Sequence, residues 1–125
     1  MLAFCTEASK HYREAARIAE KVAIAYSKPA NIVVAGMGGS AISGELLKDW
    51  TRDKGPVPIE VSREYSLPAY ANKNTLVFVT SYSGETEESL SAFLDAIKRK
   101  FLCRFKVRKN NHVYNSDSYY IGGGF

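Results

Sequence analysis

Two turns in this sequence carry residue types suited to binding an anion. The first, Gly36-Met37-Gly38-Gly39-Ser40, follows an apolar β-branched run and precedes residues with helical spacing. At such a turn the backbone N–H groups and the positive end of the helix point at one place. The glycines allow close approach, and we expect Ser40 to cap the helix and to donate its hydroxyl to a bound oxygen. A tight turn without a ligand is the alternative.

The second turn, Ser81-Tyr82-Ser83-Gly84-Glu85-Thr86, offers three hydroxyl groups, on Ser81, Ser83 and Thr86. It also lies between an apolar run and helical spacing, so both turns are expected at the edge where open α/β sheets bind ligands. Three neutral donors and two helix N-termini would hold a phosphate without Lys or Arg. Simple N-capping by Ser83 or Thr86 is the competing interpretation of those single residues.

The spacing differs from that of the better-known nucleotide sites. The sequence contains no GxxxxGK[ST], so a P-loop would lack its lysine. Gly36, Gly38 and Ser40 approach the dinucleotide fingerprint, and Glu60 follows about twenty residues later, at the spacing of the ribose-binding acid. A dinucleotide site is therefore an alternative, although it gives the serine-rich turn no role.

The elements that must position the two turns alternate between helix and strand. Strands are predicted near 31–35, 57–61 and 75–80, and helices over 7–26, 41–50 and 89–100. Apolar runs without polar alternation are typical of parallel strands covered on both faces. We therefore predict an α/β fold, a three-layer αβα sandwich with a mostly parallel, doubly wound sheet of flavodoxin-like topology.

The predicted helices have distinct apolar faces. The spacing over 7–26 indicates an amphipathic helix that packs on another part of the molecule. Its His11 is expected to be at the surface or half-buried. In the helix over 41–50, one face is shared by Ile42, Leu46, Leu47 and Trp50.

The composition changes after residue 100. Residues 1–100 contain 14 alanines and 13 Lys or Arg against 12 Asp or Glu, whereas residues 101–125 contain no alanine and four basic residues against one acid. Residues 101–107 alternate apolar and polar types, which suits an edge strand. We expect Lys109 and His112 to lie in a solvated loop.

Length and composition exclude several classes of protein. The chain has 125 residues, of which 46% are hydrophobic and 24% charged, as in a single small globular domain. No membrane span, signal-peptide core or one-sided basic stripe for nucleic acid is predicted. Cys5 and Cys103 lie far apart, so we expect free thiols in a reducing compartment, the cytoplasm.

The segments NIVVAGMGGSAISGELLKDW, VPIEVSREYSLPAY and NTLVFVTSYSGETEESLSAFLDAIKR resemble one family. They are similar to the first sugar isomerase (SIS) domain of the bifunctional phosphoglucose/phosphomannose isomerases, over roughly residues 31–100. The SYSGETEE motif is found in SIS domains generally, whereas GMGGSAISG together with the SREY segment points to the bifunctional isomerases. The resemblance divides the chain into an SIS portion, 1–100, and a divergent tail, 101–125.

The resemblance implies a site and a reaction. Gly38, Gly39 and Ser40 would line a sugar-phosphate site, in which Ser81, Ser83 and Thr86 hold the phosphate. The implied reaction interconverts glucose 6-phosphate or mannose 6-phosphate with fructose 6-phosphate, without metal or organic cofactor. The family's acid and base residues lie downstream of the second turn, so we expect an incomplete SIS fold, inactive alone and truncated or frame-shifted after residue 100. Sheet edges and helix faces left uncovered by the missing strands would favour a homodimer or marginal stability. A non-enzymatic phosphosugar sensor and a nonfunctional fragment are the alternatives.

Overall fold

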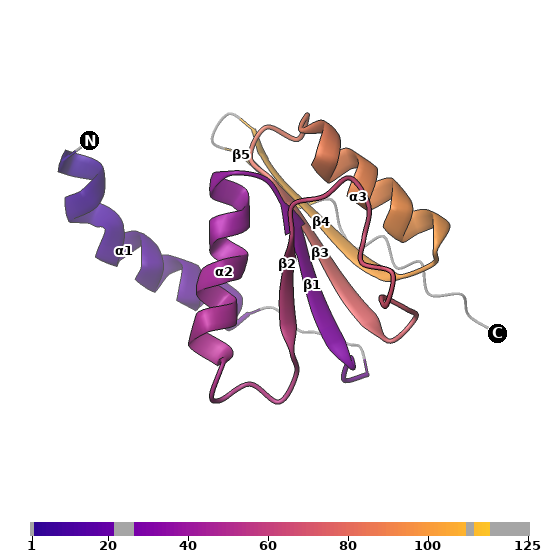
Figure 1. Ribbon diagram of the computed structural model, residues 1–125. Helices are drawn as coiled ribbons and strands as arrows, with labels where there is room; N and C mark the ends of the chain where they lie inside the picture. The colour runs from indigo at the N-terminus through magenta and orange to yellow at the C-terminus, as the bar shows by residue number, and fades with distance from the viewer. Residues whose placement is uncertain (1, 22–26, 110–111, 116–125) are drawn as a thin grey trace.

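The computed structural model describes residues 2–21, 27–109 and 112–115 (Figure 1). Positions 22–26 of the first predicted helix lie outside the described residues. The elements are α1 (Leu2–Ala19), β1 (Asn31–Gly36), α2 (Gly39–Thr51), β2 (Ile59–Ser62), β3 (Thr75–Ser81), α3 (Glu87–Lys98), β4 (Leu102–Lys109) and β5 (His112–Asn115). None of the described helices is both long enough and apolar enough to cross a bilayer.

The five strands form one sheet in the order β2-β1-β3-β4-β5. β1 pairs in parallel with both β2 and β3, β3 pairs in parallel with β4, and β5 runs antiparallel to β4. The order 2-1-3-4 is that of flavodoxin-like sheets, in which the chain leaves β1 in one direction and β3 in the other. The predicted α/β class and mostly parallel sheet are confirmed.

Helices α2 and α3 cover opposite faces of the sheet, which gives three layers (Figure 1). The main core lies under α3, because Ala92 and Ala96 of this helix pack against alternate residues of the central strands. Its buried members are Val33, Ala35, Leu67, Ala71, Val77, Val79, Ala92, Ala96, Phe101 and Cys103. Val33 and Val77, paired partners on β1 and β3, are completely buried.

Small residues bring α2 close to the other face of the sheet. Its buried residues are Ala41 and Gly44. A Cβ atom on Gly44 would lie 2.8 Å from Cγ1 of Val34 and 3.1 Å from Cγ2 of Val61, so a side chain at this position has no room. As a result, the large apolar residues that share one face of α2 point away from the sheet, with Trp50 70% exposed.

The interior position of β4 corrects the predicted edge strand. β4 lies between β3 and β5, and β5 forms the edge. Among the described contacts, α3 packs on β4 and α2 does not. A strand that a helix covers on one face only is expected to alternate between apolar and polar residues, even inside a sheet. The alternation over 101–107 therefore arises because one face of β4 is covered, and not because β4 is an edge strand. Lys109 and His112, predicted in a loop, are paired residues of β4 and β5.

Helix α1 packs on no other described helix or strand. None of its Cα atoms lies within 8 Å of another helix or strand. Figure 1 shows it extending from the α2 side of the molecule. The predicted amphipathic helix is therefore present over Leu2–Ala19, but the expected packing of its apolar face is not found within one chain.

One arginine fastens the long β2–β3 loop to the end of α3. The Arg99 guanidinium donates to the carbonyl oxygen of Ala71 at 2.7 Å and, over 3.2–3.4 Å, to those of Leu67, Pro68 and Ala69. It also forms an ion pair with Asp95 at 3.4 Å and lies 4.4 Å from the centre of the Phe101 ring. The loop therefore has a defined path across the α3 side of the sheet.

Candidate functional site

The two turns singled out in the sequence meet at the carboxyl ends of β1 and β3. These strands are neighbours, with Gly36 at the end of β1 paired to Thr80 near the end of β3. The connection from β1 passes over one face of the sheet through α2, and the connection from β3 passes over the other through α3. The turns thus flank the point at which the strand order reverses, where doubly wound sheets bind ligands.

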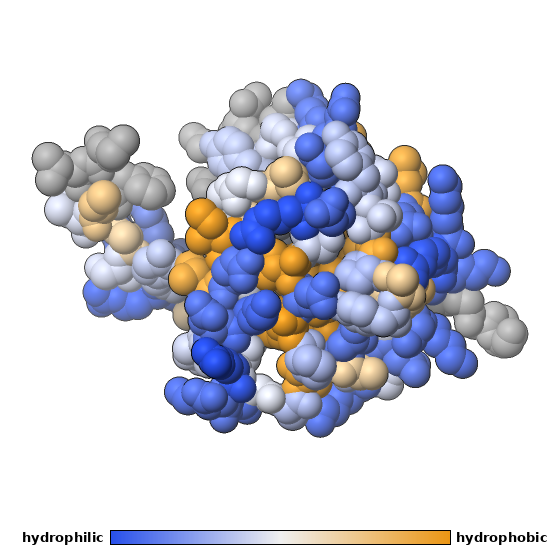
Figure 2. Space-filling model, viewed as in Figure 1, coloured by the Kyte–Doolittle hydropathy of each residue, from blue (hydrophilic) through white to orange (hydrophobic). Residues whose placement is uncertain are grey.

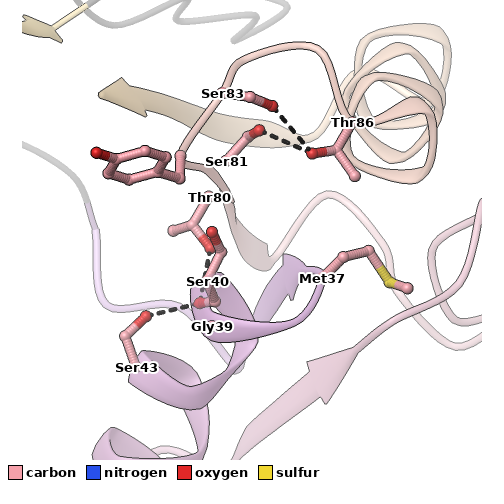
Figure 3. Close-up of a pocket in the computed structure, with 9 residues that line it drawn as sticks. Met37, Gly39, Ser40, Ser43, Thr80, Ser81, Ser83 and Thr86 are labelled. Carbon is pink, nitrogen blue, oxygen red and sulfur yellow. Dashed lines mark hydrogen bonds between the residues drawn. The ribbon is translucent and has the colours of Figure 1, made fainter. Parts of the chain in front are cut away.

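A pocket of about 640 Å³ opens between the two turns (Figure 3). Five of the six predicted site residues line it, and the sixth, Gly38, shapes the turn beside it. Four lining residues were not predicted, namely Met37, Ser43, Thr80 and Tyr82. Ser43 could have been found from helical spacing, because it lies one turn after Ser40, and Thr80 from its place at the end of β3.

Gly38, and not Ser40, occupies the N-cap position of α2. Gly38 has φ +52°, a conformation that a residue with a side chain rarely adopts. Ser40 is in the first turn of the helix and no side-chain capping bond forms, which corrects the predicted N-cap role. The Ser40 hydroxyl has no hydrogen-bond partner in the described part of the chain, so it is available to a ligand.

A hydrogen bond between the turns fixes their separation. Thr80 Oγ1 donates to the backbone carbonyl of Ser40 at 3.2 Å, and Ser43 Oγ donates to the same oxygen at 2.8 Å. Figure 3 shows Thr80 pointing toward the start of α2. Two residues about forty positions apart along the chain are thereby in contact, and the floor of the pocket is set by the sheet and not by either loop alone.

The three predicted hydroxyl groups of the second turn form a connected cluster. Thr86 Oγ1 lies 3.2 Å from Ser81 Oγ and 3.4 Å from Ser83 Oγ (Figure 3). The backbone N–H of Gly84 donates to Ser81 Oγ, and that of Glu85 donates to Ser83 Oγ. Ser81 is 5% exposed, whereas Ser83 is exposed. Ser81 therefore orders the turn, and Ser83 and Thr86 are the groups that solvent or a ligand can reach.

Thr86 is the N-cap residue of α3, but its side chain makes no capping bond. This observation removes the N-capping alternative for its hydroxyl.

The first turn of α3 contains two acids, Glu87 and Glu88, whereas the first turn of α2 contains none. Glu88, followed by burial and Glu87, raises the pKa of the nearby Tyr65. The positive end of α3 is thus partly neutralised, and α2 offers the stronger field for an anion.

The acid that a dinucleotide site would need is engaged elsewhere. The Tyr70 hydroxyl donates to Glu60 Oε2, and burial, followed by this bond and the charge of Glu60, raises the pKa of Tyr70 to about 12. Glu60 also lies in the interior of β2 and not at its carboxyl end. The geometry favours an anion pocket over a dinucleotide site.

His11 and the two cysteines do not line the pocket. His11 is on α1, exposed, with Nε2 3.9 Å from Glu7 Oε2. Cys5 is exposed and Cys103 buried, and both are free thiols. Burial raises the pKa of Cys103 to about 12. Among the described residues, no group of three or more His, Cys, Asp or Glu side chains is placed to hold a metal ion.

No family model matches the chain, but curated proteins do. The bifunctional phosphoglucose/phosphomannose isomerase of Caldicellulosiruptor bescii is 54% identical over 65 residues, which are 52% of this chain and 19% of that protein. The proteins of the same name from Thermoplasma acidophilum and Aquifex aeolicus are each 45% identical, over 69 and 75 residues. These matches cover 55% and 58% of this chain and 21% and 23% of the relatives.

The resemblance to the bifunctional isomerases is confirmed. It holds over roughly half of the chain, and the matched segment spans about a fifth of the isomerases' length. Two proteins that share only the α/β class are not expected to be 54% identical in sequence. This segment is therefore homologous to part of a bifunctional isomerase.

A solved structure is similar in fold to nearly the whole chain. It is a protein of Clostridium difficile, provisionally described as a phosphosugar isomerase, with a TM-score of 0.60 over 96% of this chain and 33% of that one. At 18% identity the likeness shows the fold alone. The predicted α/β fold is thus confirmed, and this chain spans about a third of the length of that protein.

Proposed function

We propose that this chain binds a sugar phosphate in the pocket between the β1–α2 and β3–α3 turns. The observation that carries the proposal is the convergence of two turns on one pocket, with available hydroxyl groups on both sides. In our proposal Ser40, Ser83 and Thr86 donate to the phosphate, Ser81 orders their turn, and Gly38 and Gly39 bring backbone amides close. The volume of about 640 Å³ suits a hexose phosphate, since small-molecule sites commonly have volumes of about 300–1,000 Å³.

We further propose that the site is the phosphate-binding part of a glucose-6-phosphate/mannose-6-phosphate isomerase that forms fructose 6-phosphate in the cytoplasm. The names of the curated relatives support this reaction class. Moving a proton between C1 and C2 needs a base, an acid that opens the ring and a cation beside the enediolate. The pocket is lined by Gly, Ser, Thr, Tyr and Met residues. It is therefore equipped to bind, and other segments, in this copy or a partner copy of a homodimer, would supply the catalytic groups.

The same lining supports a second candidate, a non-enzymatic phosphosugar-sensing module. Binding without turnover would be its complete function. An assay for fructose 6-phosphate formed from glucose 6-phosphate and from mannose 6-phosphate separates the candidates, because any saturable turnover favours the isomerase.

The binding proposal is tested by a thermal-shift titration of the full chain with fructose 6-phosphate. Fructose and inorganic phosphate are the ligand controls. A ligand that binds the folded state alone stabilises it by RT ln(1 + L/Kd), where L is the free ligand concentration, so the unfolding temperature rises steadily once that concentration exceeds Kd. We expect such a concentration-dependent rise with the sugar phosphate and weaker effects of the two controls.

Two variants make the test specific to the pocket. Ser40→Ala removes a hydroxyl without a partner and should leave the ligand-free unfolding temperature unchanged while weakening binding by roughly 1–3 kcal/mol. Ser83→Ala should weaken binding similarly and also loosen the turn, because Ser83 Oγ accepts the Glu85 N–H. Ser66→Ala, at an exposed serine of the β2–β3 loop, is the matched control. Equal affinity in all four proteins would contradict the proposed phosphate contacts.

A further inference from the structure

Helix α2 presents a large apolar face to solvent. Ile42, Leu46 and Trp50 follow each other at intervals of four residues and are 55%, 60% and 70% exposed. They lie on the face of the helix opposite Ala41 and Gly44, which pack on the sheet. Figure 2 shows hydrophobic surface on the α2 side of the molecule. Contiguous apolar surface of this kind marks an interaction site in a folded protein.

Helix α1 has a complementary apolar face without a partner. Cys5, Ala8, Tyr12, Ala15 and Ala19 recur at three- and four-residue intervals along one stripe. Tyr12 is 71% exposed, and no other helix or strand of the described chain lies within 8 Å of the helix Cα atoms. Most of the stability of a helix in a protein comes from packing of its amphipathic face, so the stability of this 18-residue helix depends on packing of the stripe.

We propose that α1 of one copy packs against the outward face of α2 in a second copy. A two-fold axis would form this contact twice, because each copy supplies one α1 and one α2. The inference gives a surface to the homodimer proposed above and does not depend on the sugar-phosphate pocket.

The sizes of the side chains support this pairing. The α2 face carries three large residues, whereas the middle of the α1 stripe carries alanines on both sides of Tyr12, and Ile18, 58% exposed, lies at the edge of the stripe. Alternating large and small residues across two helices allows interdigitation at native density. Two α2 faces brought together would instead oppose Leu46 and Trp50 with the same large side chains, which separates the helices.

The area available is sufficient for a stable dimer. Each aromatic side chain buries roughly 150–250 Å² when it is fully covered. Two copies each of Tyr12 and Trp50, about 70% exposed, would therefore supply several hundred Å², before the aliphatic residues of four helices are counted. Stable interfaces bury about 1,200–2,000 Å² in total, which two helix pairs of this length can reach.

The arrangement within one chain favours a second copy over the chain's own α1. The structure places α1 beside the α/β body and out of contact with α2 of the same chain (Figure 1). If α1 packs on α2 of a second copy, the α/β part of each copy keeps its structure. If α1 packs on α2 of its own chain, α1 has to move relative to β1.

The test is the association state of the full chain, measured by sedimentation over a concentration series. We expect a dimer that Tyr12→Glu and Leu46→Glu each weaken, raising the dimer dissociation constant roughly 30-fold or more. Leu94→Glu is the matched control, since Leu94 is 54% exposed on α3. Circular dichroism checks folding, and the fructose 6-phosphate titration shows separately whether the pocket is intact. A monomeric wild type, or a dimer indifferent to Leu46→Glu, overturns the proposal.

Cross-linking identifies the partners. With Cys5 replaced by Ser, chains carrying Tyr12→Cys are mixed with chains carrying Leu46→Cys and oxidised mildly. Both positions are near the middle of their helices, so they approach in either helix direction, and a disulfide needs Cα atoms within about 7 Å. A disulfide between different chains supports the exchange. Linkage inside one chain carrying both substitutions, or only between two Tyr12→Cys chains, overturns it.

Discussion

Replacing Arg99, the C-cap residue of α3, by methionine should destabilise the fold more than the loss of any single charge within that helix. The substitution keeps an unbranched stem beside Phe101 but removes every guanidinium donor to the β2–β3 loop, whereas the Leu67 N–H bond to Asp95 remains between this loop and α3. The bond to the Ala71 carbonyl at 2.7 Å is the strongest, and those to Leu67, Pro68 and Ala69, at 3.2–3.4 Å, are weaker. Without the guanidinium, these oxygens lose a charged partner.

The magnitude follows from these contacts. A hydrogen bond to a charged group contributes about 1.5–3 kcal/mol, and a cation–π contact at a partly exposed site about 0.5–1 kcal/mol. The Arg99 side chain is 29% exposed, so water replaces part of what is lost. We expect a decrease of about 2–3 kcal/mol in the free energy of unfolding, or roughly 8–12 °C in Tm for a chain of this size.

Urea unfolding followed by circular dichroism measures this change. Lys98→Met is the matched control, because Lys98 is the exposed basic neighbour at the end of the same helix. It should cost less than about 1 kcal/mol, the usual value of a cation near a helix C-terminus. Arg99→Lys should recover only part of the stability, since one ammonium cannot reach several carbonyls. Equal decreases in the free energy of unfolding for Arg99→Met and Lys98→Met would refute the conclusion that Arg99 holds the β2–β3 loop in place.

Three further outcomes are expected. Gly44→Val should destabilise by about 1–3 kcal/mol in the same assay, because its Cβ would meet Val34 and Val61, and an unchanged midpoint would contradict the close approach of α2. Folding raises the pKa of Tyr70 from 10.0 to about 12 and so favours the neutral phenol; wild-type stability should therefore fall between pH 10 and about 12, and urea titrations of Tyr70→Phe should lack this part of the decline. A chromogenic disulfide reagent should modify Cys5 rapidly and Cys103 only on unfolding, because Cys103 is buried with a pKa of about 12, and fast reaction of both thiols would contradict that burial.

The location of the site could be predicted from sequence because it depends on local patterns. An apolar run followed by Gly-rich or Ser-rich residues and then helical spacing defines a strand, a turn and a helix. Parallel pairing then brings the carboxyl ends of β1 and β3 together. The position of Ser40 inside α2 could not be read in this way. Gly38 takes the cap because only its positive φ suits the turn, and sequence spacing does not reveal φ.

The direction of the helix faces was harder to predict than their existence. Ile42, Leu46 and Trp50 share a face of α2, but hydrophobicity alone does not say which face meets the sheet. The distance between the α2 backbone and the sheet decides which face is buried. At Gly44 there is room only for a hydrogen atom between Val34 and Val61. The alternation in β4 was similarly ambiguous, because a strand with one covered face and a strand at an edge give the same period.

The neutral lining of the pocket determines how binding there should respond to salt. No Lys or Arg among the described residues lines the pocket, so an oxyanion would be held by hydroxyl and amide groups at contact distance. Attraction between full charges in solvent is screened over about 8–10 Å at physiological ionic strength, whereas short hydrogen bonds inside a pocket are affected much less. Residues 101–125 carry four basic residues and one acid, and they would attract the same anions in dilute buffer. Raising the ionic strength should therefore remove the diffuse association and leave the pocket occupied.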